Sequence, residues 1–351
     1  VCVLSINSFS QAYKTTNDSL ECIIKISTYK EYVLKKYYDE AYPHWLASYN
    51  SCPASTKNIY LDGVKIYQSF IEKEKDKTKR LALIDSLMAV YDKRIAYFGQ
   101  EDYVLGLKGV DLLRYNKQKF EEGYGYLLKS IKSQRNETDA AMVLTFMQST
   151  GGMFKNGKIS SQDVLENYML CIDILEYQLF DAKKNVNTTD YLAFKNNLVQ
   201  LENQKAELIE TLGESGREVI DVEKEISTLK KENSYANKLA KAEMAITSTE
   251  NIFTQSGAAS CQVLVDIFSP KFNNNKTDVE LLKKITTILD NSECNESPLF
   301  TEASEQLYKI EPSSRAAYNI AQLFVKNKDF NKAIEYYQKA ISIEQDELAK
   351  A

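Results

Sequence analysis

The sequence predicts an all-α fold, an α-solenoid built from paired antiparallel helices. Only 12 glycines and 5 prolines occur among 351 residues, which is few for a β-rich chain with many tight turns. Apolar residues instead recur at i, i+3 and i+4, for example within 77–97 and 162–179. A repeated order of small and large apolar residues at both ends of the chain indicates helix pairs that stack on their neighbours.

The clearest repeat begins at Ser314 and ends at Glu347. With Ser314 as position 1, positions 4, 7, 8, 11, 17, 20, 24 and 27 are Ala317, Ile320, Ala321, Phe324, Phe330, Ala333, Tyr337 and Ala340. This order resembles the tetratricopeptide (TPR) repeat, in which small residues at 8, 20 and 27 let two helices approach closely. The segment departs from that pattern at position 4, where Ala317 replaces Trp, and at position 32, where Gln345 replaces Pro.

The same spacing recurs near the start of the chain. Tyr32, Tyr38, Ala41, Trp45, Ser48 and Pro53 take positions 11, 17, 20, 24, 27 and 32, and Ile59, Gly63 and Ile66 continue in register. A degenerate copy contains Phe120, Gly123, Leu127 and Ser130. The resemblance therefore implies a TPR-like α-solenoid whose structural positions include Ala41, Trp45, Pro53, Gly63, Ala321, Ala333, Tyr337 and Ala340.

Residues 187–251 carry a different pattern. Phe194, Leu198, Leu201, Lys205, Leu208 and Leu212 follow a 4-3 spacing, and Val219, Val222, Ile226, Leu229, Ala236 and Leu239 repeat a heptad-like spacing after the turn at 213–216. We predict an antiparallel coiled-coil hairpin with halves 190–212 and 217–239; two ordinary solenoid helices are the alternative. The hairpin separates N-terminal repeats at 12–186 from a C-terminal block at 252–351, which we expect to continue beyond the given chain.

Two features favour an exported protein. Residues 1–11 resemble the end of a signal peptide, with Ser8 and Ser10 at the spacing that signal peptidase prefers. Cys22 with Cys52, and Cys261 with Cys294, each bracket one predicted helix pair, whose two ends are neighbours and within disulfide reach. Reduced, buried thiols are the alternative for both pairs.

Several function classes are disfavoured. The net charge of −5 argues against a general nucleic-acid binder, and no apolar run is long enough to span a bilayer. The single histidine, His44, has no predicted orienting group, and GxSxG, HExxH, Walker A, GxGxxG and CxxC motifs do not occur. We predict no catalytic, cofactor or metal site; a helical enzyme with an acidic cleft that acts on glycans is a less favoured alternative.

The resemblance implies a binding groove lined by positions 2, 5, 9 and 12 of the clear repeat, which are Arg315, Tyr318, Gln322 and Val325; plain solvent exposure of these four side chains is the alternative. Tyr318 and Gln322 depart from the Lys and Asn with which some TPR domains grip a C-terminal carboxylate. Together with segment 51–63, the features above resemble exported TPR proteins of Bacteroidota-type bacteria. That resemblance implies a periplasmic scaffold whose partners are proteins of a cell-envelope or outer-membrane-associated complex; a cytoplasmic TPR adaptor is the alternative.

Overall fold

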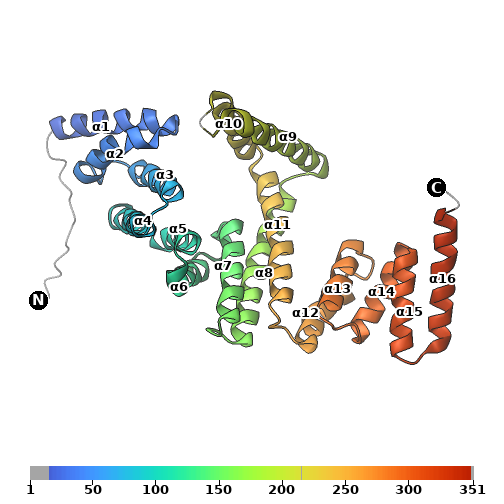
Figure 1. The fold of residues 1–351 in the computed structure, drawn as a ribbon. Coiled ribbons are helices and arrows are strands. Elements are labelled where there is room, and N and C mark those ends of the chain that lie inside the picture. Colours follow the sequence, from blue (N-terminus) through green and yellow to red (C-terminus); the bar gives the residue numbers. More distant parts are fainter. Residues whose placement is uncertain (1–15, 215, 349–351) are drawn as a thin grey trace, which may run out of the picture. The chain divides into compact units, whose positions relative to one another are not determined.

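The computed structural model describes residues 16–214 and 216–348 (Figure 1). Within them the chain forms sixteen α-helices, two short 3-10 helices and no strand. The predicted all-α, solenoid-like fold is therefore confirmed. The chain divides into two compact units, one made of Val1–Phe146 with Ile174–Glu243 and the other of Met147–Asp173 with Met244–Ala351.

The helices of the first unit are α1 (Thr16–Leu34), α2 (Tyr38–Ser51), α3 (Asn58–Lys73), α4 (Lys77–Phe98), α5 (Glu101–Tyr115), α6 (Phe120–Gln134), α9 (Thr188–Leu212) and α10 (Arg217–Glu232). The 3-10 helices Lys117–Lys119 and Arg135–Glu137 flank α6. The helices α7 (Ala140–Lys155), α8 (Ser161–Lys184) and α11 (Ser234–Gln255) contribute residues to both units. The second unit adds α12 (Cys261–Asn274), α13 (Val279–Asn291), α14 (Pro298–Ile310), α15 (Ser314–Lys326) and α16 (Phe330–Leu348).

Consecutive helices pack as pairs in the first unit: α1 with α2, α3 with α4, and α5 with α6. Helix α2 also contacts α3, and α4 contacts α5, so each pair stacks on the next. This arrangement buries an apolar stripe of each helix only against its neighbours, as the repeat pattern predicts. Short polar breaks end the helices, and Asp76 caps α4 by accepting a 2.8 Å hydrogen bond from the Lys79 backbone amide.

Trp45 forms the centre of the first core. Its side chain is fully buried, and its indole Nε1 donates a 2.7 Å hydrogen bond to the Ile59 carbonyl oxygen on α3. Rings of Tyr42, Tyr49 and Tyr67 lie 4.9–5.9 Å from the Trp45 ring. The tyrosine-rich sequence therefore supplies a packed aromatic seam between α2 and α3.

Glycines set the closest helix approach, between α5 and α6. A Cβ built on Gly109 lies 2.8 Å from the Gly123 carbonyl oxygen, and one built on Gly123 lies 2.9 Å from Leu113. Only residues without a side chain allow two backbones to come this close. The degenerate copy at 120–130 thus lies on α6, which pairs with α5, and its Leu127 and Ser130 are fully buried.

The hairpin differs from its predicted form. Helices α9 and α10 pack against each other, and near their connection the Gly216 amide donates a 3.1 Å hydrogen bond to the Gly213 carbonyl oxygen, so an antiparallel hairpin is present (Figure 1). The return half does not continue to residue 239, however. It ends at Glu232, and after Asn233, whose backbone leaves the helical region at φ −107° and ψ 49°, a separate helix α11 begins.

Both expected cysteine pairs form disulfides, with Cα–Cα distances of 5.8 Å for Cys22–Cys52 and 5.3 Å for Cys261–Cys294. One detail was wrong: Cys22 does not precede the first helix but lies inside α1. Cys171 is a buried thiol. The predicted leader, residues 1–11, lies outside the described residues.

Candidate protein-binding site

The candidate site lies on the last helix pair, α15 and α16. Ser313 begins α15 by accepting a 3.1 Å hydrogen bond from the Ala316 backbone amide. The pair is held by a buried cluster of mostly small and aromatic side chains, which are Ala317, Ile320, Ala321, Phe324, Ala333, Tyr336 and Ala340. Rings of Tyr308 on α14 and of Phe324 each lie 5.6 Å from Tyr336. The scaffold beneath the site is therefore well packed.

Three side chains from both helices meet above this core. The Gln322 side-chain Nε2 donates a 2.6 Å hydrogen bond to the Tyr337 hydroxyl oxygen. The Tyr318 ring meets the Tyr337 ring edge-on, with 5.7 Å between centroids. Tyr337 is half-buried, whereas the Tyr318 side chain remains 51% exposed. A large aromatic surface is thus held in place by its neighbours and presented to solvent.

Beside these rings the surface is hollowed. The depression has a volume of about 640 Å³ and is lined by Ser313, Ser314, Tyr318, Tyr337, Ala340, Ile341 and Glu344. Ile341 is 56% exposed, so the hollow combines apolar walls with two serines and a carboxylate. Exposed aromatic and aliphatic groups with a few polar groups at the edge are typical of protein-binding surfaces.

Charges around this surface are already partly neutralised. The Lys339 ammonium forms a 2.6 Å ion pair with Glu335, and it lies 4.3 Å from the centroid of the Tyr336 ring. Burial, with the nearby Glu305 carboxylate, raises the pKa of the Tyr336 hydroxyl, so this phenol stays neutral. The surface therefore combines apolar contact area with the Gln322 amide, two serine hydroxyls and the Glu344 carboxylate.

The four predicted groove residues are only partly brought together. Tyr318 and Gln322 both contact Tyr337, and Val325 is 38% exposed on the same helix. The Arg315 side chain lies outside the described part of the structure. Sequence reasoning missed Ile341 and Glu344 as lining residues, because the repeat pattern marks positions that hold the fold and not those that remain uncovered.

The other predicted structural positions are buried or half-buried. Ala41 and Trp45 are fully buried on α2, and Gly63 lies beneath the Trp45 ring. Pro53 follows α2 immediately, and its carbonyl oxygen accepts a 2.8 Å hydrogen bond from the Tyr60 hydroxyl. Ala321, Ala333 and Ala340 lie in the α15–α16 core.

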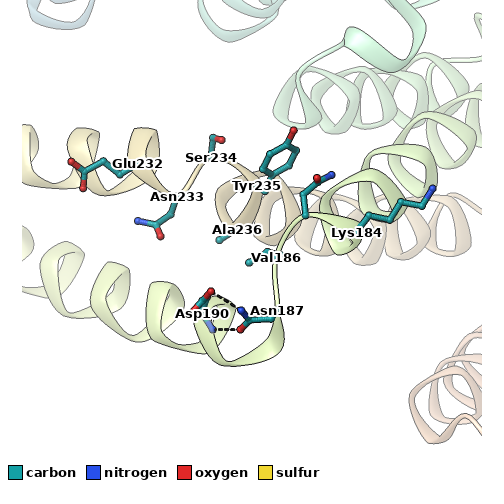
Figure 2. A pocket seen from close by; sticks show the side chains of 10 residues that line it. Lys184, Val186, Asn187, Asp190, Glu232, Asn233, Ser234, Tyr235 and Ala236 are labelled. Atoms are coloured by element: carbon teal, nitrogen blue, oxygen red, sulfur yellow. Dashed lines mark hydrogen bonds between the residues drawn. The ribbon is translucent and has the colours of Figure 1, made fainter.

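A second hollow, of about 460 Å³, lies where the α9–α10 hairpin joins α8 and α11 (Figure 2). It is lined by polar side chains on both sides of the junction, including Lys184, Glu232 and Tyr235. Asn187 and Asp190 bind each other: the Asn187 amide donates to the carboxylate at 2.7 Å, and the Asp190 backbone amide donates back at 2.9 Å. Both residues are therefore occupied in capping α9.

Among the described residues, no group of three or more His, Cys, Asp and Glu side chains is placed to hold a metal ion. The His44 ring stacks on the Tyr32 ring at 6.0 Å between centroids, which is a packing role. None of the described helices combines the length and apolar character needed to cross a lipid bilayer.

The paired, stacked helices define a helical-repeat, solenoid-like fold. Residues 314–347, which include α15 and nearly all of α16, match the family model of the tetratricopeptide repeat. The chain thus contains a TPR-type repeat at the candidate site. No curated protein sequence matches the chain.

Proposed function

We propose that this chain is a non-enzymatic scaffold or adaptor that binds other proteins. One observation carries the proposal: the TPR repeat at 314–347 presents the rings of Tyr318 and Tyr337 beside an exposed Ile341. Tetratricopeptide repeats suggest protein–protein interaction. The partner surface expected here is apolar, with neutral hydrogen-bonding groups that reach Gln322 and Glu344.

The test is purification of the tagged chain from its native source under mild conditions, followed by identification of every chain that co-purifies. Tyr318→Ala and Ile341→Asp remove the exposed apolar surface without touching the buried cluster, so both should release a specific partner. The matched control is Lys328→Ala, on the turn between the two helices. Recovery of the chain alone, or partner binding that survives both surface variants, contradicts the proposed site.

We further propose that the protein works in a periplasmic or cell-envelope assembly, including one associated with the outer membrane. The two cysteine pairs at disulfide distance support an oxidising compartment. Mass mapping of non-reduced peptides tests this proposal. Recovery of both disulfide-linked peptides from cells supports export, whereas free Cys22, Cys52, Cys261 and Cys294 thiols favour the cytoplasmic adaptor.

Within that scaffold we propose three separate segments: repeats at 12–186, a hairpin at 187–251, and a C-terminal repeat block at 252–351. The packing of α9 on α10 supports a distinct hairpin. Deletion of 188–232 with a short flexible replacement should leave partner binding at Tyr318 intact. Loss of that binding in a folded variant would contradict the division of the chain into a separate hairpin and C-terminal block.

A further inference from the structure

The α9–α10 hairpin joins the rest of its unit through two short breaks. Asn187 precedes α9 in an extended conformation, at φ −83° and ψ 162°, and Asn233 separates α10 from α11. The hollow of about 460 Å³ is lined by both breaks (Figure 2). Phe194, in the second turn of α9, is buried, whereas the two breaks themselves line open space rather than a packed core. Residues at helix ends of this kind can absorb the dihedral changes of a hinge.

A direct hydrogen bond crosses the base of the hairpin. The Tyr191 hydroxyl on α9 donates to the Glu243 carboxylate on α11 at 2.5 Å. The bond links the first turn of α9 to a neighbouring helix, next to the break at Asn187. Because this bond lies close to the break at Asn187, it restrains rotation of the far end of the hairpin only weakly.

The other end of the hairpin contacts the turn between α1 and α2. The Lys36 ammonium lies 2.8 Å from Oε2 of Glu223 on α10, and it donates a 3.2 Å hydrogen bond to the Glu214 carbonyl oxygen in the hairpin turn. The second carboxylate oxygen of Glu223 pairs with Lys205 on α9 at 3.0 Å. Glu223 therefore joins the two hairpin helices to each other and to Lys36.

This contact is polar and partly exposed. The side chains of Lys36, Glu223 and Lys205 are 24%, 31% and 28% exposed. The buried apolar cluster of the first repeats, from Tyr29 to Tyr115, contains no described residue of the hairpin. Partly exposed ion pairs are weak and are screened by salt. The hairpin tip is thus held by interactions that ionic conditions can change, while the repeats beneath it are held by a core that such conditions leave intact.

We propose that the α9–α10 hairpin is a hinged strap that closes on the α1–α2 turn through the Lys36–Glu223 ion pair and opens about Asn187 and Asn233. In the closed position the two charges neutralise each other. In the open position Lys36 and Glu223 become available to charged groups of another molecule. The strap is independent of the binding surface at Tyr318 and requires no partner for its test.

The first test is a zero-length carbodiimide cross-link, which joins an ammonium to a carboxylate only when the two are in contact. Lys230 and Glu202, 2.9 Å apart inside the hairpin, provide the control, because opening the strap leaves this pair together. At about 0.05 M salt both linked peptides are expected. At about 0.5 M salt the Lys36–Glu223 peptide should fall about two- to fivefold relative to the control. An unchanged ratio, or no Lys36–Glu223 peptide at low salt, overturns the proposal.

A second test measures the distance between spin labels on exposed Glu40 of α2 and exposed Glu225 of α10. The labels should be carried by non-cysteine side chains, so that the native disulfides remain. Lys36→Glu should shift the distances to a longer, broader distribution, and Lys36→Arg should retain the closed distance. Lys73→Glu, which changes a charge on α3 that pairs with Asp39, is the matched control. If Lys36→Glu gives the wild-type distribution, the ion pair does not hold the strap.

Discussion

Single residues set the distance between helices in the first repeats. A Cβ built on Gly63 lies 2.4 Å from the Trp45 Cζ2 atom, inside the contact limit of two carbons. Because Trp45 is surrounded by other rings and its Nε1 is hydrogen-bonded to the Ile59 carbonyl, the indole cannot move aside without losing that bond. Trp45 and Gly63 are therefore matched: the large indole ring on α2 fits because Gly63 on α3 has no side chain beneath it.

Gly63→Ala should destabilise the first unit. Overpacking of a filled core costs about 1–3 kcal/mol, which exceeds the gain of about 1 kcal/mol expected from replacing a helical Gly with Ala. Gly125→Ala is the matched control, since Gly125 is exposed in α6 and no atom lies within 4 Å of its added Cβ. This control should raise the free energy of unfolding by about 1 kcal/mol. Urea unfolding measures the change in the free energy of unfolding for both variants. Equal changes would refute the packing argument.

Sequence reasoning identified Trp45 and Gly63 because both stand at positions where the repeat demands a large and a small residue. It did not identify the polar network around Asp111, which is 4% exposed. The Tyr91 hydroxyl and the Gln68 amide donate to its carboxylate at 2.6 Å and 2.9 Å. These residues come from three helices, α3, α4 and α5, and no spacing along the chain connects them.

Burial raises the pKa of the Asp111 carboxyl, although the hydrogen bonds from Tyr91 and Gln68 oppose the shift. The folded state then binds this proton more tightly than the unfolded chain does. The contribution of Asp111 to the free energy of unfolding therefore decreases as pH rises from about 4 toward the raised pKa. Asp111→Asn removes this dependence, so the stability of the variant relative to wild type should increase with pH across that window.

Asp163 provides a control of opposite sign. Hydrogen bonds from the Ser160 hydroxyl and backbone amide lower the pKa of its carboxyl, so its stabilising contribution is present above the unfolded pKa and is lost as pH falls. Asp163→Asn should therefore lose stability relative to wild type as pH rises. Denaturant unfolding between about pH 3 and pH 7 measures both differences. If the difference in the free energy of unfolding from wild type changes with pH in the same direction for both variants, the two opposite pKa shifts are contradicted.

At the scale of elements, each disulfide fastens one helix pair. Cys22 on α1 is linked to Cys52 directly after α2, and Cys261 at the start of α12 is linked to Cys294 after α13. Each link closes a loop of about 30 residues and restricts the unfolded chain more than the folded one. The sequence predicted these links because the ends of an antiparallel pair are neighbours. It misplaced Cys22, since the apolar pattern does not mark where α1 begins.

Replacing Cys22 and Cys52 together with alanine should lower the free energy of unfolding by about 2–4 kcal/mol. A reducing agent should lower the stability of the wild-type chain by more than it lowers that of the variant, which retains only Cys261–Cys294. Chemical denaturation with and without the reductant measures both changes. If the double replacement leaves the oxidised protein equally stable, the link does not restrain the α1–α2 pair.

Helix α10 ends just before a polar residue, Asn233, that the predicted heptad pattern did not include. The apolar spacing Leu229 to Ala236 skips the intermediate seam position, which is Asn233. In the structure the Asn233 side-chain amide donates a 3.0 Å hydrogen bond to the Leu229 carbonyl oxygen, and the helix ends there. A polar residue at a seam position both interrupts apolar packing and offers the backbone an alternative hydrogen bond. Because the residues around Asn233 keep the apolar spacing, the sequence analysis did not predict a helix end at this position.

At the scale of the molecule, the sequence predicted the all-α solenoid class because paired amphipathic helices leave few other arrangements. The division into two compact units was not predicted. It cuts through α7, α8 and α11, each of which reads as one continuous helix along the sequence. Helix periodicity reports which face of a helix is buried, but it does not report which neighbours bury each half.

In a stacked array, stability is nearly a sum of local terms. The two units should therefore respond separately to local changes, and unfolding need not follow one cooperative transition. Gly63→Ala disturbs the Trp45 core of the first unit, whereas replacing Cys261 and Cys294 with alanine loosens α12 and α13 of the second. Each change should accelerate amide hydrogen exchange within its own unit and leave the slowest amides of the other unchanged. If either change accelerates exchange equally in both units, the chain unfolds as one cooperative body and the local account of its stability is wrong.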